Sequence, residues 1–208
     1  MEMPLMRVVG ITLVALAFSA CSTTSPIVSD WSNPAYTSAS FERILVASMG
    51  GDTSVRRNFE DEFVVQLRAA GIDASPSYRL IPEEEKLDEA RLKQAAQTTK
   101  ADAVLFARLL QVEQKSEYGP SYFPSTSFGI FGEHVGAAWH GLGGAPRVYR
   151  YNEYVSETTL HDVSKNDVVW TGTIKTTERE NVNAAIKSYV QAVIKALQEK
   201  NLLPDRRG

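Results

Sequence analysis

The sequence predicts an α/β fold, a single domain over residues 41–203 in which about three helices pack on a mixed β-sheet in two or three layers. Short apolar runs alternate along the chain with stretches whose apolar residues recur every three or four positions, which indicates strands alternating with helices. The length of 208 residues and the 43% of hydrophobic residues suffice for one buried core. Because strands that alternate with helices form crossover units, we expect the sheet to be at least partly parallel.

The first part of this domain is expected to run strand, helix, strand. Residues 44–47 are apolar and predict a buried strand, and Gly50-Gly51-Asp52 predicts a tight turn with an Asp or Ser cap for the next helix. That helix is predicted to end at Gly71, and its inner face comprises Val55, Phe59, Phe63 and Leu67. Residues 72–78 predict a second strand at an edge of the sheet, because Pro76 cannot donate to a ladder.

The middle of the domain repeats this alternation. Pro82 and the three glutamates at 83–85 predict a loop and the acidic start of a second helix. Consecutive helical residues point about 100° apart, so these glutamates do not converge on a metal ion. The helix is expected to end near Lys100, its inner face is formed by Leu92, Ala95, Ala96 and Thr99, and residues 103–110 follow as a nearly continuous apolar strand.

The last part predicts a hairpin and a terminal helix. Residues 148–160 are rich in Tyr, Val and Thr, and a polar turn at 162–167 leads into a strand with Val168, Trp170 and Ile174 on one buried face. The final helix is expected to end near Lys200, with Asn201 as a left-handed cap and with Leu202 and Leu203 docking the end of the chain. Its apolar face comprises Val182, Ile186, Tyr189, Val193 and Leu197.

Residues 118–146 interrupt the pattern. These positions hold 7 of the 13 glycines, 3 prolines and 6 aromatic residues, and Glu133 is the only charge. An insertion of this length is typical of functional or disordered segments, but disordered segments are poor in aromatic residues. The composition therefore indicates either a surface that meets another protein or a membrane, or a mobile lid packed on its own domain. The candidate partner-binding residues are Tyr122, Phe123, Phe128, Phe131 and Trp139.

The first 20 residues predict a cleaved signal peptide. Arg7 and the amino terminus make a slightly positive start, and an apolar run from Val8 to Ala20 ends in small residues. This run has 13 residues, whereas a membrane-spanning helix needs about 20. We therefore expect the segment to be removed.

Cys21 is the only cysteine in the chain, so no disulfide framework is possible. The residues before it, Leu16-Ala17-Phe18-Ser19-Ala20, resemble the lipobox of bacterial lipoproteins, with Phe18 where that family prefers leucine. The resemblance implies that the Cys21 thiol carries a diacylglycerol and that palmitate is incorporated. The residue after the cysteine is Ser22 and not aspartate, which resembles the enterobacterial-type signal for transfer to the outer membrane. The resemblance implies a periplasmic-facing anchor there, with retention in the inner membrane as the alternative. Residues 21–40 are rich in Ser, Thr, Pro, Ala and Asn, and predict a flexible tether whose Trp31 and Tyr36 rest on lipid or on the domain.

Catalytic, metal and nucleic-acid chemistry is not indicated. The net charge of −3 gives no electrostatic case for nucleic acid, and Gly50-Gly51-Asp52 matches no phosphate-binding motif. His134 and His140 lie six residues apart, which is no standard zinc spacing, and His161 lies at the hairpin turn as an exposed polar residue. We expect no catalytic residue, no metal and no cofactor.

The order of elements resembles a family of bacterial outer-membrane lipoproteins of unknown function. It is more distantly similar to the fold of the curli-secretion lipoprotein and of the lipoprotein activator of penicillin-binding proteins. The resemblance is carried by residues 43–46, 67–72, 101–105, 160–162 and 168–170, none of which is a catalytic motif. It implies an α/β fold and an envelope location.

The leading hypothesis is a lipid-anchored, non-catalytic interaction or assembly module of the cell envelope, which acts through the aromatic segment and one sheet edge and has an envelope protein as its partner. One alternative is an oligomeric secretion-pore component, which the resemblance to curli secretion implies. Another is an enzyme with an unrecognised site.

Overall fold

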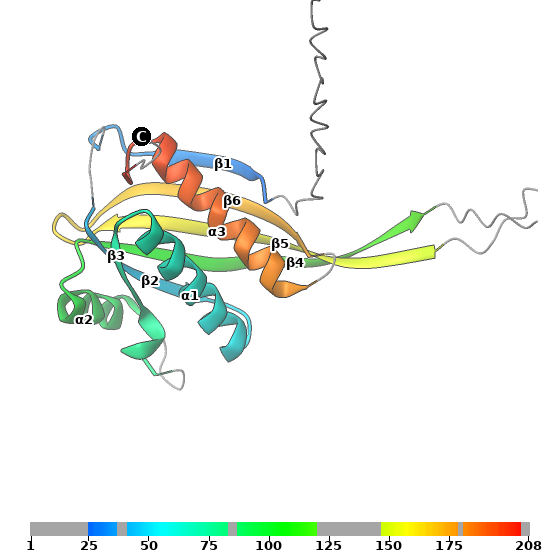
Figure 1. Cartoon of the computed structure of the whole chain (residues 1–208), viewed down its shortest axis with the longest axis horizontal. Helices are drawn as coiled ribbons and strands as arrows, with labels where there is room; N and C mark the ends of the chain where they lie inside the picture. The colour runs from blue at the N-terminus through cyan, green and yellow to red at the C-terminus, as the bar shows by residue number, and fades with distance from the viewer. Residues whose placement is uncertain (1–24, 37–40, 83–86, 120–146, 179–180, 205–208) are drawn as a thin grey trace, which may run out of the picture.

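Three helices pack on a six-stranded mixed sheet, which confirms the predicted α/β class (Figure 1). The computed structural model describes residues 25–36, 41–82, 87–119, 147–178 and 181–204. Its elements are β1 Ile27–Ser32, β2 Arg43–Met49, α1 Thr53–Ala69, β3 Asp73–Pro76, the 3₁₀ turn η1 Ser77–Arg79, α2 Glu89–Thr99, β4 Ala103–Gly119, β5 Arg147–Asp162, β6 Asp167–Glu178 and α3 Val182–Glu199.

The sheet has the strand order β1-β6-β5-β4-β2-β3. Strand β2 runs parallel to β3 and β4, whereas β4, β5, β6 and β1 pair antiparallel. The predicted partly parallel sheet is therefore confirmed, and β3 lies at an edge as Pro76 indicated. The helical connections β2–α1–β3 and β3–α2–β4 make the parallel pairs possible, because a parallel pair needs a crossover between its strands.

The two faces of the sheet are covered differently. Helices α1 and α3 lie together on one face over the larger core, in which Phe63, Leu105 and Trp170 are fully buried. Helix α2 packs on the opposite face, where Ala95 and Ala96 meet Leu45 on β2 in a smaller core. This second core lies mainly on the β2–β4 side, and among the residues that the structure describes no helix covers the same face of β5 and β6. We call the side of α1 and α3 the helix face and the other side the open face.

The helix boundaries follow from the caps that the sequence indicated. The Asp52 carboxylate accepts hydrogen bonds from the backbone N–H groups of Ser54 and Val55, both at 2.9 Å, and so begins α1. Gly71 has a φ of 89°, which lets the Ile72 N–H donate to the Leu67 carbonyl at 3.0 Å after the helix ends. Asn201 has a φ of 55°, the predicted left-handed conformation, and Leu202 and Leu203 after it are buried.

The expectation of a flexible tether over residues 21–40 is wrong for residues 25–36. Strand β1 pairs with β6, the Trp170 indole N–H donates to Asp30 at 3.3 Å, and the Lys200 ammonium lies 2.9 Å from the same carboxylate. Tyr36 is buried, and its hydroxyl donates to Asp162 at 3.1 Å, so it rests on the domain. The polar composition of this segment concealed the strand, because an edge strand needs few apolar residues when its backbone pairs with a neighbour.

The β5–β6 hairpin forms as predicted, but one of its faces differs. A bulge places Val169 outside the register between the pairs Leu160–Trp170 and His161–Val168. Val169 and Trp170 are therefore both fully buried, whereas Val168 pairs with His161 on the open face. The predicted common face of Val168, Trp170 and Ile174 is correct for Trp170 and Ile174 only.

Two further expectations fall at the limits of the described residues. Strand β4 continues to Gly119, so the first two positions of the predicted insertion at 118–146 belong to a strand. The predicted acidic helix start at 83–85 lies outside the described residues, and α2 begins at Glu89, where the Asp88 carboxylate accepts from the Arg91 N–H.

Candidate functional site

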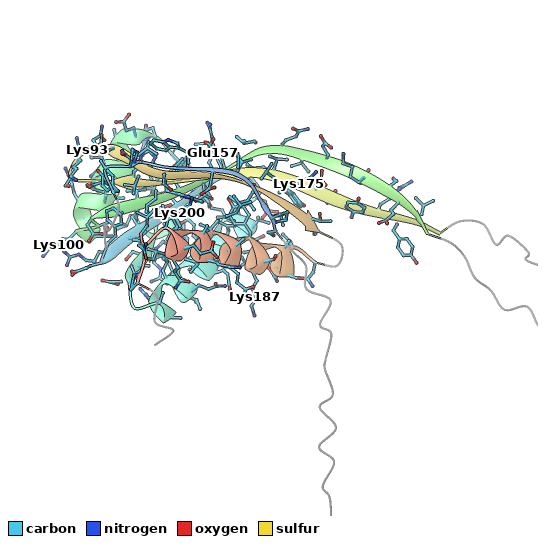
Figure 2. The ribbon with its side chains drawn as sticks, turned by 90° about the horizontal axis from the view of Figure 1, so that it is seen from above. Lys93, Lys100, Glu157, Lys175, Lys187 and Lys200 are labelled. Carbon is cyan, nitrogen blue, oxygen red and sulfur yellow. The ribbon has the colours of Figure 1, made fainter. Side chains whose placement is uncertain are left out.

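The longest strand pair of the molecule projects beyond the rest of the sheet. Strands β4 and β5 pair from Ala103–Asp162 to Gly119–Arg147 with one bulge, whereas β2 pairs with β4 only as far as Arg108 and β6 reaches only Asn152 on β5. Residues 115–119 and 147–151 therefore form a two-stranded ribbon without a third strand in the described part of the chain (Figures 1 and 2). Both ends of the 120–146 segment are joined to the tip of this ribbon.

A bulge marks the base of the ribbon. The register of β4 against β5 shifts between Leu109 and Gln111, which leaves Leu110 outside the ladder and about half exposed. Val112, Val148 and Tyr149 farther along are exposed to a similar extent. A two-stranded ribbon is marginally stable alone, and exposed apolar side chains on it are expected to be covered by a partner.

The open face beside the ribbon carries alternating charges. Glu153 on β5 accepts from Lys175 on β6 at 2.9 Å, and Lys115 on β4 pairs with Glu113 and lies 3.9 Å from Glu153. On the same face, the Arg108 guanidinium on β4 lies 2.9 Å from the Glu157 carboxylate on β5. Figure 2 shows Glu157 and Lys175 on this sheet. Hydrogen bonding to Lys115 lowers the pKa of Glu113. The glutamates of these pairs are partly buried, with the Glu153 side chain 13% exposed, so the face is a charged surface whose ions are matched with one another.

The helix face of the ribbon base carries a polar cluster around Glu178. The Tyr154 hydroxyl and the Asn152 amide both donate to this carboxylate. Burial, followed by the Glu178 carboxylate, raises the pKa of Tyr154. The tyrosine is therefore a neutral hydrogen-bond donor at neutral pH rather than a nucleophile.

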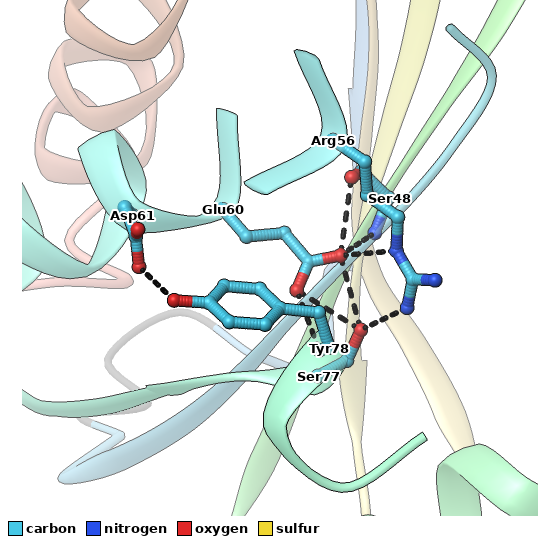
Figure 3. A network of polar contacts seen from close by, with 6 residues as sticks. All are labelled: Ser48, Arg56, Glu60, Asp61, Ser77 and Tyr78. Carbon is cyan, nitrogen blue, oxygen red and sulfur yellow. Dashed lines mark hydrogen bonds and ion pairs between the residues drawn. The ribbon is translucent and has the colours of Figure 1, made fainter. Parts of the chain in front are cut away.

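A second polar cluster lies in the core around Glu60, a fully buried carboxylate on α1 (Figure 3). It accepts from the Ser48 N–H at 3.0 Å, the Tyr78 N–H at 3.1 Å and the Arg56 Nε at 3.1 Å, and Ser77 Oγ lies 3.0 Å from both its oxygens. The cluster ties α1 to β2 and η1. Because the acceptor positions of Glu60 are occupied by protein donors, the carboxylate has a structural role and no free position from which to take a proton from a substrate.

His161 does not lie exposed at the turn, as the sequence suggested. It is half-buried on β5, its Nε2 lies 3.0 Å from Thr159 Oγ1, and burial lowers its pKa. The next residue, Asp162, is nine-tenths buried and caps the hairpin turn by accepting from the Ser164 N–H at 2.8 Å and the Lys165 N–H at 3.1 Å. Burial would raise the pKa of Asp162, but these hydrogen bonds lower it below its ordinary value.

The described ranges contain no group of three or more His, Cys, Asp or Glu side chains able to hold a metal ion. They also contain no helix with the length and apolarity needed to cross a membrane.

The sequence-predicted site residues lie outside the described part of the chain. These are Cys21, the candidate lipid-attachment residue, together with Tyr122, Phe123, Phe128, Phe131 and Trp139 and the loop histidines His134 and His140. The sequence predicted the β5 side of the ribbon as part of the strand at 148–160, but it missed the β4 side, because the preceding strand was expected to end at Leu110. Its signal was weak, because both faces of the ribbon are exposed and residues 111–117 show polar side chains at nearly every position rather than an apolar–polar alternation.

No protein-family model and no curated protein matches the chain. Similar solved structures include the PelC dodecamer from Paraburkholderia phytofirmans, which is 18% identical, with 86% of this chain and 99% of that chain covered and a TM-score of 0.48. The lipoprotein GNA1162 from Neisseria meningitidis is 15% identical over 76% of this chain and 98% of that chain, with a TM-score of 0.38. The hypothetical protein CT253 from Chlamydia trachomatis is 10% identical over 76% and 97%, with a TM-score of 0.37. At these identities and TM-scores the likenesses lead to no conclusion about what this chain binds or does.

Proposed function

We propose that this chain is a lipid-anchored, non-catalytic interaction or assembly module of the bacterial cell envelope, held at the periplasmic side of the outer membrane by a lipid on Cys21. The observation that carries the interaction role is the β4–β5 ribbon, which holds the ends of an aromatic, glycine-rich segment away from the packed core. The lipobox-like residues before Cys21 support the anchor.

The chemistry of the described side chains supports a binding role over a catalytic one. Glu60 has its acceptor positions occupied, Tyr154 is held neutral by burial and Glu178, and His161 has its Nε2 beside Thr159. Hydrolytic catalysis needs a nucleophile, a base and an orienting acid within hydrogen-bond reach of one another. Glu60, Tyr154 and His161 take part in no such trio.

The ribbon offers two means of recognition. Strand β2 covers one edge of β4 only as far as Arg108. Beyond Arg108 no described strand pairs with this edge, so its backbone is available for pairing with a strand of another protein. The half-exposed Val112 and Val148 supply apolar contacts beside that edge, and the charged open face supplies specificity. The partner is thus expected to present an extended segment with apolar side chains.

The anchor is tested by Cys21→Ser. The wild-type protein is expected to incorporate labelled palmitate and to sediment with the outer membrane, because several acyl chains at about 0.8 kcal/mol per buried CH₂ hold a protein essentially permanently. The serine variant is expected to lose the label and to become soluble or to remain an uncleaved precursor, whereas Ser22→Ala, which keeps the thiol, should behave as wild type. A cleaved serine variant that still sediments with the outer membrane at high salt would contradict the proposed anchor.

The ribbon is tested by photo-cross-linking in intact cells. A photoreactive residue at Val112 or Val148 is expected to yield a discrete adduct with an envelope protein, because Val148 is half exposed on the ribbon and Val112 is half exposed on the β4 edge that leads to it. The matched control is Val65, which is at least as exposed but lies on α1, away from the ribbon. If Val65 gave the same adducts as Val112 and Val148, the ribbon would not be the interaction surface.

A further inference from the structure

A cavity of about 300 Å³ opens between the N-terminal ends of α1 and α3, above β4, β5 and β6. Its lining is mainly apolar. Val55 and Phe59 come from α1, Leu109 from β4, and Val182 and Ile186 from α3. Ligand sites in proteins are clefts of roughly 300–1,000 Å³ with mostly apolar walls, so this cavity has the size of a site for one small group.

Three of the larger polar side chains in its wall are already paired with protein atoms. The Tyr189 hydroxyl is hydrogen-bonded to Thr158, the Tyr154 hydroxyl donates to Glu178, and Arg56 donates to Glu60 and Ser77. A bound water needs two to four polar partners, and a polar ligand needs free ones. The wall therefore favours an occupant without hydrogen-bonding groups.

The first described residues of the chain lie beside this cavity. Ser25 is buried, its hydroxyl donates to Ser188 on α3 at 3.0 Å, and it accepts from Thr176 on β6 at 3.1 Å. Thr176 is itself part of the cavity wall. Cys21 precedes Ser25 by four residues, which span at most about 14 Å. A group attached to the Cys21 sulfur thus remains within reach of the cavity, because hydrogen bonds fix the chain at Ser25.

We infer that the cavity holds part of one acyl chain of the lipid that Cys21 carries. This inference rests on the proposed lipid anchor. Methylene groups are removed from water when they enter an apolar cavity, just as they are when they enter a bilayer. The free energy gained by burying the chain is therefore similar in the two places. The remaining chains keep the protein on the membrane, and the occupied cavity fixes the domain close to its anchor.

The test uses the intact lipoprotein in membranes from cells fed a palmitate analogue with a photoreactive group in its chain. After irradiation, mass spectrometry is expected to find adducts that join the Cys21 peptide to residues of α1 or α3 at the cavity. Ser156→Phe fills the cavity from β5 and should abolish these adducts, with Ala185→Leu on α3 as a second filling variant. Thr173→Phe, on the open face of the neighbouring β6, is the matched control and should keep them.

The outcomes of this experiment distinguish the proposed lipid anchor from the proposed occupant of the cavity. The inference is supported if Cys21 is labelled, the wild type gives the adducts and both filling variants lose them. At least one of these variants must then resist trypsin as the wild type does, which shows that it is folded. Label on Cys21 with adducts to phospholipid only, or with adducts that persist in the trypsin-resistant filling variants, overturns the inference and leaves the anchor intact. If Cys21 carries no label, the anchor itself is refuted, and the proposed occupant with it.

Discussion

Glu60 is a carboxylate removed from water at the junction of α1, β2 and η1, and its charge is matched by Arg56, whose side chain is 12% exposed. The removal of a charge from water costs several kcal/mol unless the partners are well placed. Here two backbone N–H groups, two serine hydroxyls and a guanidinium supply those partners. The cluster also fixes Ser77 and Tyr78, where the chain leaves the edge strand β3 (Figure 3).

Glu60→Gln is expected to lower the free energy of unfolding by about 3 kcal/mol. The amide keeps the size of the side chain, so no cavity forms, but Arg56 loses its counter-charge and the amide NH₂ faces donors. Urea unfolding measures the loss. Glu89→Gln, an exposed change in the first turn of α2, should alter stability by less than about 0.5 kcal/mol. Equal losses in the two variants would show that the buried charge does not stabilise the fold.

At the scale of the element, β6 joins the N-terminal segment to the centre of the sheet. It pairs with β1 on one side and β5 on the other, and its buried Trp170 and Ile174 lie under α3. Gly172 lies between them in the alternation, and the Trp170 indole covers it so closely that a Cβ there would overlap the ring. The glycine is thus required for space rather than for an unusual backbone angle.

Gly172→Ala is expected to destabilise the domain by about 2 kcal/mol, in the range of overpacked cores, because Trp170 must leave its position under α3. The ring also loses its hydrogen bond to Asp30 on β1 when it moves. Chemical unfolding followed by tryptophan fluorescence measures both effects. Thr173→Ala, the next residue on the open face, serves as the control, and a Gly172→Ala protein as stable as this control would show that the indole has room to move.

At the scale of the whole molecule, the sequence predicted the helices and the parallel part of the sheet because their apolar periodicity and caps are local. Val55 to Leu67 and the Asp52 cap define α1 without reference to the rest of the chain. Strand β1 and the part of β4 that enters the ribbon escaped prediction because their order comes from pairing with distant strands, and a polar strand carries little periodic signal. The bulge at Val169 escaped for a similar reason, since a one-residue shift in register is decided by the packing of both neighbours.

The features of the candidate site likewise fall into those that the sequence could predict and those that it could not. The lipid-attachment residue and the aromatic segment could be proposed from residue types alone, whereas the ribbon that carries the segment and the cavity near Ser25 depend on which strands lie side by side. The fully buried Glu60 had no sequence signal either. It lies one residue after Phe59 on an amphipathic helix, where a glutamate is normally solvated.

The pairing of β1 with β6 also has a mechanical consequence. Force applied through residues N-terminal to Ser25 reaches the sheet at the Ile27–Ile174 end of the ladder, so the load falls first on the hydrogen bonds at that end. Because β1 is an outermost strand, its detachment breaks one ladder and leaves the pairing of the other five strands in place. Release of the strand residues 27–32 would lengthen the connection by at most about 20 Å. The first strand can thus act as an extensible segment that yields under tension before the domain unfolds.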